Sequence, residues 1–427
     1  MKYNPLSKDI FNKNRKLFSQ KIEKNSISIF NSNDVMPTNA DGTMPFKQNS
    51  DLFWLTGVDQ EESVFMMINN NSTIEELLFI KETNEHIAIW EGAKLSKEEA
   101  KNSSGIQKVY WIKELEKILK EKIADLDTIF LNKNIHARSS SEVQTRDDRF
   151  RDKIKVHFPN MEIKEIAPVM HELRFIKSNL EIELMQHACD ITEKGLRRIL
   201  PIIKPGIMEY EIEAELMHEF LLNRSSGFAY QPIIGSGSDS CVLHYIENNK
   251  MCLDGDILLM DFGAEYANYA SDLTRTVPVN GVFSPRQKSV YNAVHRVMKQ
   301  ATNMLRPGTD HKKMQQEVIK IMEEELIKLG LFDRHDVKKQ DPKSPLFKKY
   351  FMHGTSHSLG LDVHDVGDTK TPMSEGMIFT CEPGIYIREE GIGIRLENDI
   401  LITKGDPNDL MKNIPIEIDE IEDLMNK

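Results

Sequence analysis

The sequence of 427 residues predicts a smaller α/β domain followed by a larger α+β domain. Three observations indicate this fold class. Short strand-like runs alternate with helix-like segments before about residue 150, long amphipathic helices follow residue 178, and the later strands carry acidic side chains at their ends. A change from the stretch PNMEIKEIAP to a charged helix start places the boundary near residue 170, so the domains span residues 1–170 and 171–427.

Composition argues against several classes of function. The 55 Lys and Arg against 67 Asp and Glu give a net charge of -12 without a long basic run, so nucleic acid is not an expected partner. We interpret the four cysteines as reduced thiols because they lack CxxC or metal-finger spacing: Cys189, Cys241, Cys252 and Cys381. No apolar run is long enough to cross a membrane and the N-terminus lacks an apolar signal core, so we expect no membrane partner and a cytoplasmic protein.

The first domain alternates predicted strands with helical segments. SISIF, VFMMI, ELLFI and HIAIW are predicted strands, and KELEKILKEKI has the apolar spacing of a helix. The loop after the first strand contains Asp41, whose simplest role is to form a turn and whose alternative role is substrate contact. Because this domain contains no cluster of His, Cys or carboxylates, we expect it to support the second domain or to mediate oligomerisation.

The second domain begins with two predicted helices, EIELMQHACDITEKGLRRIL and EYEIEAELMHEFLL, separated by a Pro-Gly pair. A Gly- and Ser-rich loop then leads to a predicted strand carrying His244. Two further helices are predicted at about residues 285–305 and 312–329, so the pattern of two helices followed by strands occurs twice. Residues 332–350 lack periodicity and are predicted to form a loop or lid.

Residues 260–276, MDFGAEYANYASDLTRT, form the candidate functional centre. Asp261 ends an apolar run and Asp272 opens a β-prone run, so a β-hairpin would bring the two carboxylates side by side. Two like charges at close range are unfavourable unless a proton or a cation lies between them. A metal pair meets this requirement, and the alternative interpretation is that each aspartate forms a turn at its strand end.

Three histidines lie close together in the mostly non-helical stretch HGTSHSLGLDVHDVG: His353, His357 and His364. Neutral imidazole is the commonest nitrogen ligand of divalent ions and an acid or base near neutral pH. The alternative for His364 is a buried structural histidine bonded to neighbouring backbone. HExxH spacing is absent, which excludes a zincin.

Two C-terminal segments add carboxylates to the candidate centre. Glu382 ends the apolar run MIFTC before a Pro-Gly turn, and the alternating run GIGIRLENDILIT is predicted as one strand with Arg395, Glu397 and Asp399 on its polar face. With the hairpin aspartates, Glu382 and Glu397 supply four negative charges, which match two divalent ions such as Mn²⁺, Co²⁺ or Zn²⁺ better than one. The sequence therefore predicts a dinuclear site, with metals roughly 3.5 to 4 Å apart and a bridging hydroxide as the nucleophile.

The ordered residues Asp261, Asp272, His357, Glu382 and Glu397 resemble the five-ligand signature of the pita-bread metallopeptidases, the group of methionine aminopeptidase, Xaa-Pro aminopeptidase and prolidase. The strings MDFGAEYANYASDLTRT, HGTSHSLGLDVHDVG, CEPGIY and GIGIRLENDI are similar to the same family. PFKQNSDLFWLTG resembles the N-terminal domain of Xaa-Pro aminopeptidases. The resemblance implies a pita-bread catalytic domain behind an N-terminal domain of that kind.

The resemblance also implies a metal-binding role for five residues. Asp261 would chelate one metal, and His357 and Glu382 would complete the two sites. Asp272 and Glu397 would bridge the metals. Glu382 would also relay a proton from the hydroxide to the leaving imino nitrogen.

Further residues match positions on the substrate side of the family. Three histidines would orient the scissile carbonyl and stabilise the tetrahedral intermediate: His244, His353 and His364. Arg395 matches an arginine behind the metal ligands. Residues near the substrate would be Tyr386, Asp41 and Trp90.

The implied activity is hydrolysis of the N-terminal Xaa-Pro bond by a metallo-aminopeptidase with two divalent ions per chain, Mn²⁺ first and Co²⁺ or Zn²⁺ as alternatives. Its partners would be peptides with proline at the second position, and the chain would form a homo-oligomer, a dimer or tetramer. Because a Xaa-Pro amide has no N–H, recognition must come from ring shape and the free amino terminus. The alternatives are a prolidase, which cleaves only dipeptides, and a non-catalytic pita-bread binding module, against which the complete ligand set counts.

Overall fold

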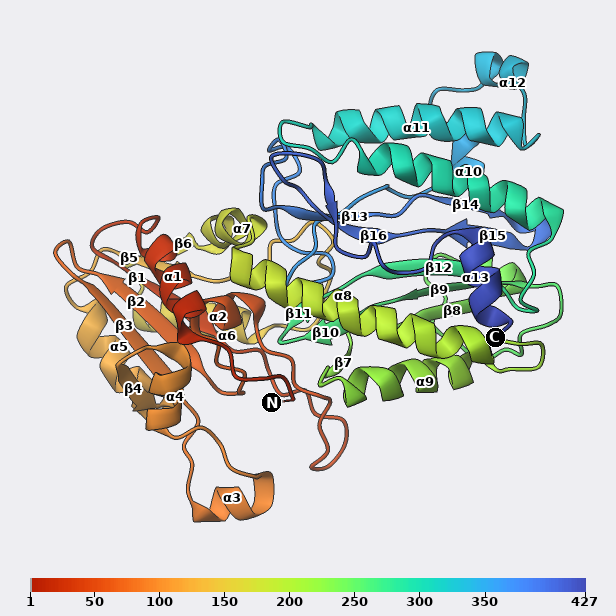
Figure 1. Ribbon diagram of the computed structural model, residues 1–427. Helices are drawn as coiled ribbons and strands as arrows, with labels where there is room; N and C mark the ends of the chain where they lie inside the picture. Colours follow the sequence, from red (N-terminus) through yellow and green to blue (C-terminus); the bar gives the residue numbers. More distant parts are fainter. Residues whose placement is uncertain (1) are drawn as a thin grey trace. The chain divides into compact units, whose positions relative to one another are not determined.

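The computed structural model describes residues 2–427, which fall into two units, Tyr3–Arg174 and Phe175–Lys427 together with Lys2. The division lies in helix α7 (Ala167–Phe175), the same helix that contains the predicted boundary near residue 170. Each unit has its own strands and its own covering helices (Figure 1).

A six-stranded sheet forms the centre of the first unit, in the order β4-β3-β2-β1-β5-β6. The central strands β1, β2 and β3 are antiparallel neighbours, whereas β4, β5 and β6 join in parallel. The strands span Ser26–Asn31 (β1), Val64–Asn69 (β2), Ile74–Ile80 (β3), Lys108–Trp111 (β4), Thr128–Leu131 (β5) and Glu162–Glu165 (β6).

Helices cover both faces of this sheet. Because neighbouring residues of a strand point to opposite faces, Ile29 and Phe30 of β1 contact different helices. Ile29 shares a buried cluster with α5 (Leu115–Ile123) and α6 (Arg146–His157), while Phe30 packs against Phe18 of α1 (Lys8–Ser19). Every residue of β1 is therefore buried, although its sequence SISIFN alternates polar and apolar residues up to Ile29.

One predicted strand of the first unit is wrong. The run HIAIW lies in a helix, α3 (Glu85–Glu91), which is capped by the Asn84 side chain accepting the Ile87 N–H at 2.9 Å. None of the residues of α3 is buried, and no strand of the sheet pairs with this segment. The remaining helices of this unit are α2 (Ser50–Thr56) and α4 (Lys97–Ser104).

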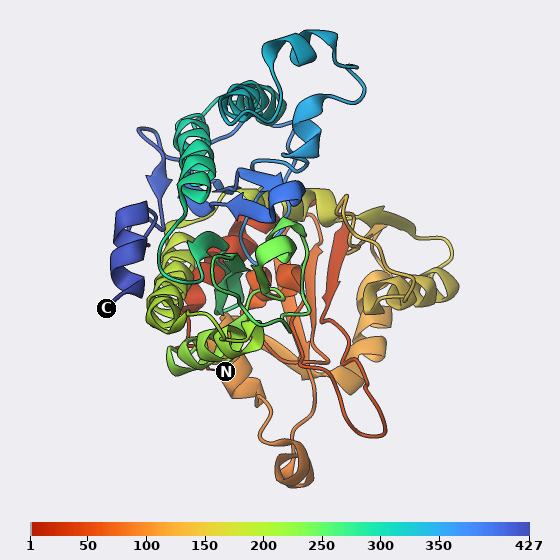
Figure 2. The ribbon, with the colours of Figure 1, turned by 90° about the vertical axis from the view of Figure 1, so that its right-hand side faces the viewer.

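The four predicted helices of the second unit are confirmed. They are α8 (Asn179–Ile199), α9 (Glu209–Leu222), α10 (Pro285–Thr302) and α11 (His311–Lys328). Helices α8 and α9 pack as one pair and α10 and α11 as another, with the strands of the unit between the pairs (Figures 1 and 2). Residues 332–350 differ from the predicted loop, because Asp333 caps a short helix, α12 (Arg334–Lys339), and a 3-10 turn follows at Leu346–Lys349.

The strands of the second unit form several small sheets. One has the order β12-β9-β8, with β8 (Ile233–Ser236), β9 (Ile257–Phe262) and β12 (Leu273–Pro278). A second contains β13 (Ile378–Cys381), β16 (Asn398–Leu401) and β17 (Asn408–Asp409), and a third pairs β14 (Gly384–Ile387) with β15 (Ile392–Arg395). The remaining elements are the short strands β7 (Gly227–Phe228), β10 (Ala264–Tyr266) and β11 (Tyr269–Ala270) and the helix α13 (Ile418–Met425).

Two strand predictions in this unit need correction. His244 lies in a turn that follows the 3-10 turn Gly237–Cys241, and the strand β8 precedes it, inside the segment predicted as a loop. The run GIGIRLENDILIT is two strands, β15 and β16, which belong to different sheets. The break occurs at Glu397, which forms a bridge to Thr274 of β12 instead of continuing β15.

The fold class predicted from the sequence is confirmed, with mixed α/β structure in both units and the long helix pairs confined to the second. The four cysteines are buried and form no disulfide, in agreement with their interpretation as thiols. Across residues 2–427, no helix is both long enough and apolar enough to span a bilayer.

Candidate active site

The hairpin formed by β9 and β12 brings Asp261 and Asp272 together. Asp261 pairs in register with Thr274, and Asp272 directly precedes β12. The segment between them is a second small hairpin of β10 and β11, whose turn residues Ala267 and Asn268 have φ of 51° and 66°. Both carboxylates therefore lie at the same end of the hairpin, as the sequence predicts.

A tyrosine that the sequence analysis did not identify contacts both aspartates. The Tyr230 hydroxyl oxygen lies 2.5 Å from Oδ1 of Asp261 and 2.6 Å from Oδ1 of Asp272. A phenol has one proton and can donate it to only one carboxylate at a time. Tyr230 thus shows how close the two aspartates are, but it cannot neutralise them.

His357 and Glu397 complete the cluster around Asp272. One ligand atom from each of Asp272, His357 and Glu397 lies within 4.8 Å of the others. His357 donates its Nδ1 proton to the Ser358 carbonyl at 3.1 Å, so its Nε2 faces Asp272 Oδ2 at 3.4 Å and Glu382 Oε1 at 3.6 Å. This arrangement is typical of a metal-binding histidine, whose second nitrogen is held by a backbone carbonyl.

Glu397 and Glu382 approach the cluster from different strands. Glu397 is 1% exposed, and its Oε2 accepts the Thr274 hydroxyl at 2.7 Å. Glu382 follows β13, and its N–H donates to the Thr355 carbonyl at 2.8 Å. Five residues predicted as metal ligands from distant parts of the sequence are therefore brought to one place.

The electrostatics of this cluster show an excess of negative charge. Burial raises the pKa of Glu397 well above its usual range, and the neighbouring Asp272, Glu382 and Asp261 raise it further. Burial likewise raises the pKa of Glu382 to about 7, with His357 and Arg395 opposing the increase. Burial opposes the protonated form of His357, but the hydrogen bond to Asp272 and the charge of Glu382 raise its pKa to about 9.

These residues fit divalent cations. Four carboxylates share one imidazole and one arginine, and the raised pKa values of Asp261, Glu382 and Glu397 indicate that additional positive charge is favoured among them. Carboxylate oxygens with a single imidazole nitrogen suit Mn²⁺, Co²⁺ or Zn²⁺. Asp272 is buried and Asp261 is half-buried, and the charges of both act on Glu397, which favours a metal site over the alternative of simple turn formers.

Arg395, Tyr386 and His353 form a hydrogen-bonded chain beside the carboxylates. The Arg395 guanidinium pairs with Asp261, donates from Nε to the Thr274 hydroxyl at 3.0 Å and donates from Nη1 to the Tyr386 hydroxyl at 2.9 Å. Tyr386 lies 2.8 Å from Nε2 of His353, whose Nδ1 donates to the Gly354 carbonyl at 2.8 Å.

This chain fixes the protonation of His353. Burial and the charge of Arg395 together lower its pKa to about 4, so the ring is neutral near pH 7. Because Nδ1 carries the proton that the Gly354 carbonyl accepts, Nε2 accepts the proton of Tyr386. Tyr386 is fully buried, so in this structure its hydroxyl orients His353 from behind.

His364 and His244 are the exposed histidines of the site. The ring of His364 packs edge-on against that of His357, with centroids 4.4 Å apart and planes at 84°. The alternative of a buried structural His364 is therefore wrong. His244 lies close enough to His353 to contribute to the lowering of its pKa.

Asp41 and Trp90 belong to the first unit, and their assignment as substrate residues stays a prediction. Asp41 lies in an exposed turn, in accord with its simplest interpretation. Trp90 is 77% exposed on α3.

Two residues of α11 hold the loop between His353 and His357, and sequence analysis missed both. The Gln315 Oε1 accepts the Thr355 N–H at 2.9 Å, and His311 donates from Nε2 to the Ser356 carbonyl at 3.0 Å. They lie four residues apart and therefore on one face of the helix. In the sequence they resemble any polar position of an amphipathic helix, which carries no functional signal.

Replacing Gln315 by alanine is expected to lower kcat about tenfold, the equivalent of about 1.4 kcal/mol, with metal content unchanged. The change leaves the Thr355 N–H without its acceptor and loosens the loop that carries His353 and His357. Gln315→Glu keeps the acceptor and is expected to retain most of kcat. Steady-state kinetics and elemental analysis on the same preparations test this, and equal losses in both variants would contradict it.

The sequence matches described families over most of its length. Residues 183–404 match the metallopeptidase family M24, and residues 11–130 match the aminopeptidase P N-terminal domain. The chain is 34% identical to a Xaa-Pro aminopeptidase of Haemophilus influenzae, over 99% of this chain and 98% of that protein.

Solved structures of aminopeptidase P are also similar to this chain. The chain is similar to a zinc-substituted aminopeptidase P of Escherichia coli in complex with product, with a TM-score of 0.89, 31% identity and 99% of each chain covered. It is also similar to proline aminopeptidase P II of Yersinia pestis, with a TM-score of 0.88, 31% identity and 98% and 99% of the two chains covered.

Proposed function

The chain belongs to the metallopeptidase family M24, and from that membership we propose that it removes the N-terminal residue of peptides whose second residue is proline. It is a metallo-aminopeptidase whose second unit has the pita-bread fold of the family. The convergence of four carboxylates and His357 in one buried cluster carries the proposal.

The proposal includes two divalent ions per chain, held by Asp261, Asp272, His357, Glu382 and Glu397. When bound, two such ions lower the pKa of water and polarise the scissile carbonyl. The oxygen-rich donor set favours Mn²⁺, with Co²⁺ or Zn²⁺ as alternatives.

The remaining roles belong to side chains at the edge of the cluster. Glu382 has a side chain that is 20% exposed, against 6% for Asp272, so it is the more accessible carboxylate for moving a proton to the leaving imino nitrogen. His364 is exposed beside His357, where its N–H would donate to the scissile carbonyl. The charge of His244 contributes to the lowered pKa of His353, and both histidines would orient the same part of the substrate.

Arg395 acts through other residues. Its pairing with Asp261 and its hydrogen bond to Tyr386 link the position of a proposed metal ligand to that of His353. A Xaa-Pro bond has no amide N–H, so the substrate must be recognised by the proline ring and the free amino terminus.

Peptide length separates the proposed activity from that of a prolidase. Metal-loaded protein is expected to hydrolyse Xaa-Pro-Yaa tripeptides faster than Xaa-Pro dipeptides, measured by release of the first residue. Cleavage confined to dipeptides would establish the prolidase instead. No cleavage of either by metal-loaded, folded protein would establish a binding module.

Metal removal is expected to abolish activity. Dialysis against a chelator should leave folded protein without hydrolysis, because the four carboxylates then have no cation to activate water. Readdition of Mn²⁺ should restore activity at two ions per chain by elemental analysis. Full activity with one ion or none would contradict the dinuclear proposal.

We also propose a homo-oligomer, a dimer or tetramer. Ile89 and Trp90 are 79% and 77% exposed on α3, and large apolar side chains exposed together are typical of contact surfaces. Light scattering of the wild-type chain and of Trp90→Ser tests whether α3 mediates assembly.

A further inference from the structure

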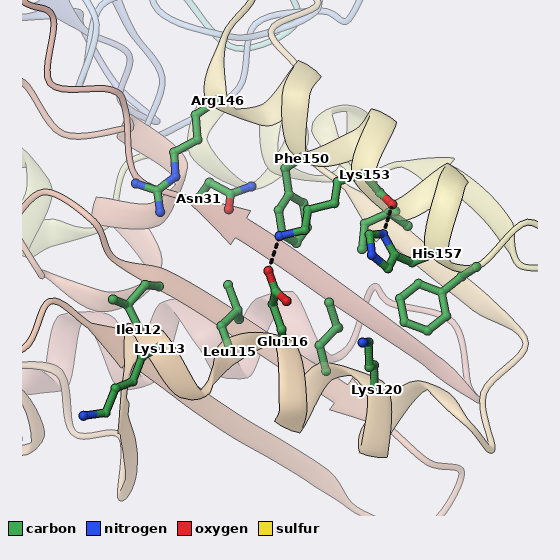
Figure 3. A pocket seen from close by; sticks show the side chains of 13 residues that line it. Asn31, Ile112, Lys113, Leu115, Glu116, Lys120, Arg146, Phe150, Lys153 and His157 are labelled. Atoms are coloured by element: carbon green, nitrogen blue, oxygen red, sulfur yellow. Dashed lines mark hydrogen bonds and ion pairs between the residues drawn. The ribbon is translucent and has the colours of Figure 1, made fainter.

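A cavity of about 310 Å³ lies in the first unit, bordered by α5, α6 and β1 (Figure 3). Its walls are largely apolar and include Leu115 and Leu119 of α5 and Phe150 and Ile154 of α6. No residue proposed for peptide hydrolysis lines it. A concave apolar space of this size is typical of sites for small organic molecules.

Asn31 of β1 supplies a polar atom without a partner inside this cavity. Its side chain is 2% exposed, and its Nδ2 donates to Asp147 Oδ1 at 2.8 Å, while its Oδ1 has no hydrogen-bond partner. Burial raises the pKa of Asp147 to about 6, so this carboxyl group is ionised at neutral pH and keeps the amide nitrogen turned toward it. The amide oxygen is therefore fixed as a buried acceptor that requires a donor.

The charges around the cavity favour an anion. Lys113, Lys120, Arg146 and Lys153 line it against the single carboxylate of Glu116. Lys153 pairs with Glu116, and Lys113 pairs with Glu82 outside the cavity. Arg146 donates to the Ser32 hydroxyl at 2.8 Å and is attracted to Asp34, Glu62 and Asp147. Within residues 2–427, Lys120 takes part in no ion pair, so its charge is the one most available to a ligand.

We propose that this cavity binds a small aromatic carboxylate that carries a ring N–H. The aromatic ring would lie between Leu115 and Phe150, which point into the same space as Asn31 (Figure 3). The ring N–H would donate to Asn31 Oδ1, and the carboxylate would face the cations of the rim. The aromatic ring of the ligand thus matches the apolar walls, its N–H matches the free acceptor, and its carboxylate matches the cations.

Indole-3-acetate is the probe, because it combines a ring N–H, an aromatic bicycle and a carboxylate. Calorimetry and ligand-observed NMR with the full metal-loaded chain are expected to detect its binding. 1-Naphthaleneacetate lacks the N–H and should bind about tenfold more weakly, as should 3-methylindole, which lacks the carboxylate. Absence of binding, or equal binding of the three compounds, would overturn the proposal.

Two variants and one control variant test which residues contact the ligand. Asn31→Leu should weaken indole-3-acetate about tenfold and leave 1-naphthaleneacetate unchanged, because only the former uses the acceptor. Lys120→Gln should weaken both carboxylates, whereas Lys117→Gln, which removes the same charge from an exposed position of α5 outside the cavity, should weaken neither.

All three variants should keep wild-type peptide hydrolysis. Equal effects of Lys117→Gln and Lys120→Gln would show that the carboxylates bind by diffuse charge and not in the cavity. If Asn31→Leu fails to fold, the comparison of the three compounds on the wild-type protein still decides the outcome.

Discussion

Glu397→Gln is expected to lower kcat/KM at least about 10³-fold, roughly 4 kcal/mol, and to weaken metal binding. The amide keeps the size of the side chain and can still accept the Thr274 hydroxyl, but it removes one charge from the proposed ligand set. Steady-state kinetics and metal titration measure the two effects. Cys381→Val is the matched control, because Cys381 is equally buried next to Glu382 and should leave both quantities nearly unchanged.

Glu397→Gln should stabilise the metal-free protein. Burial and neighbouring carboxylates raise the pKa of Glu397, so at neutral pH, above the ordinary pKa of glutamate, this residue destabilises the metal-free fold. Metal-free Glu397→Gln should therefore melt at a higher temperature than metal-free wild type. With metal bound the order should reverse, because wild type gains more binding free energy. A lower melting temperature of the variant in both states would contradict the charge excess.

His364→Ala is expected to lower kcat about 10² to 10³-fold, or roughly 3 to 4 kcal/mol, without loss of metal. The exposed imidazole can donate to charge developing on the carbonyl oxygen, and its removal opens no cavity in the core. The melting temperature should therefore stay within about a degree or two of wild type, as expected for surface substitutions.

His335→Ala provides the control for this prediction, since His335 is an exposed histidine on α12. It should leave kcat and KM unchanged. A near-normal kcat in His364→Ala, or a loss of metal that explains the loss of activity, would remove His364 from the substrate side of the site.

Residues of the candidate site could be predicted where the sequence immediately around them carries the signal. Asp261 and Asp272 stand out because each is a carboxylate beside a β-prone run, and the strands pair as their patterns predict. Tyr230 and Gln315 carry no such signal, since a tyrosine in a loop and a glutamine on a helix occur in many proteins. Their roles depend on contacts made 31 and 40 residues away along the chain.

The errors in the predicted fold have a similar origin, because they too depend on contacts between distant parts of the chain. Alternation predicts Arg395, Glu397 and Asp399 on one polar face of one strand, yet the run divides between two sheets and all three residues are buried. Local periodicity also cannot show that Glu397 leaves its strand to pair with Thr274. The α3 segment has strand-like composition, but no strand lies beside it to form the required hydrogen bonds, and its Asn84 cap favours a helix.

The bridge between Thr274 and Glu397 joins two sheets at the point where the carboxylates meet. Repulsion in chains that lack metal acts across this junction, so local opening should begin there and expose the strands to proteases. Metal supply would then govern how long each newly made chain survives as well as how fast it works. A cell short of the ion would lose the enzyme through turnover, and its abundance would follow the availability of the cation.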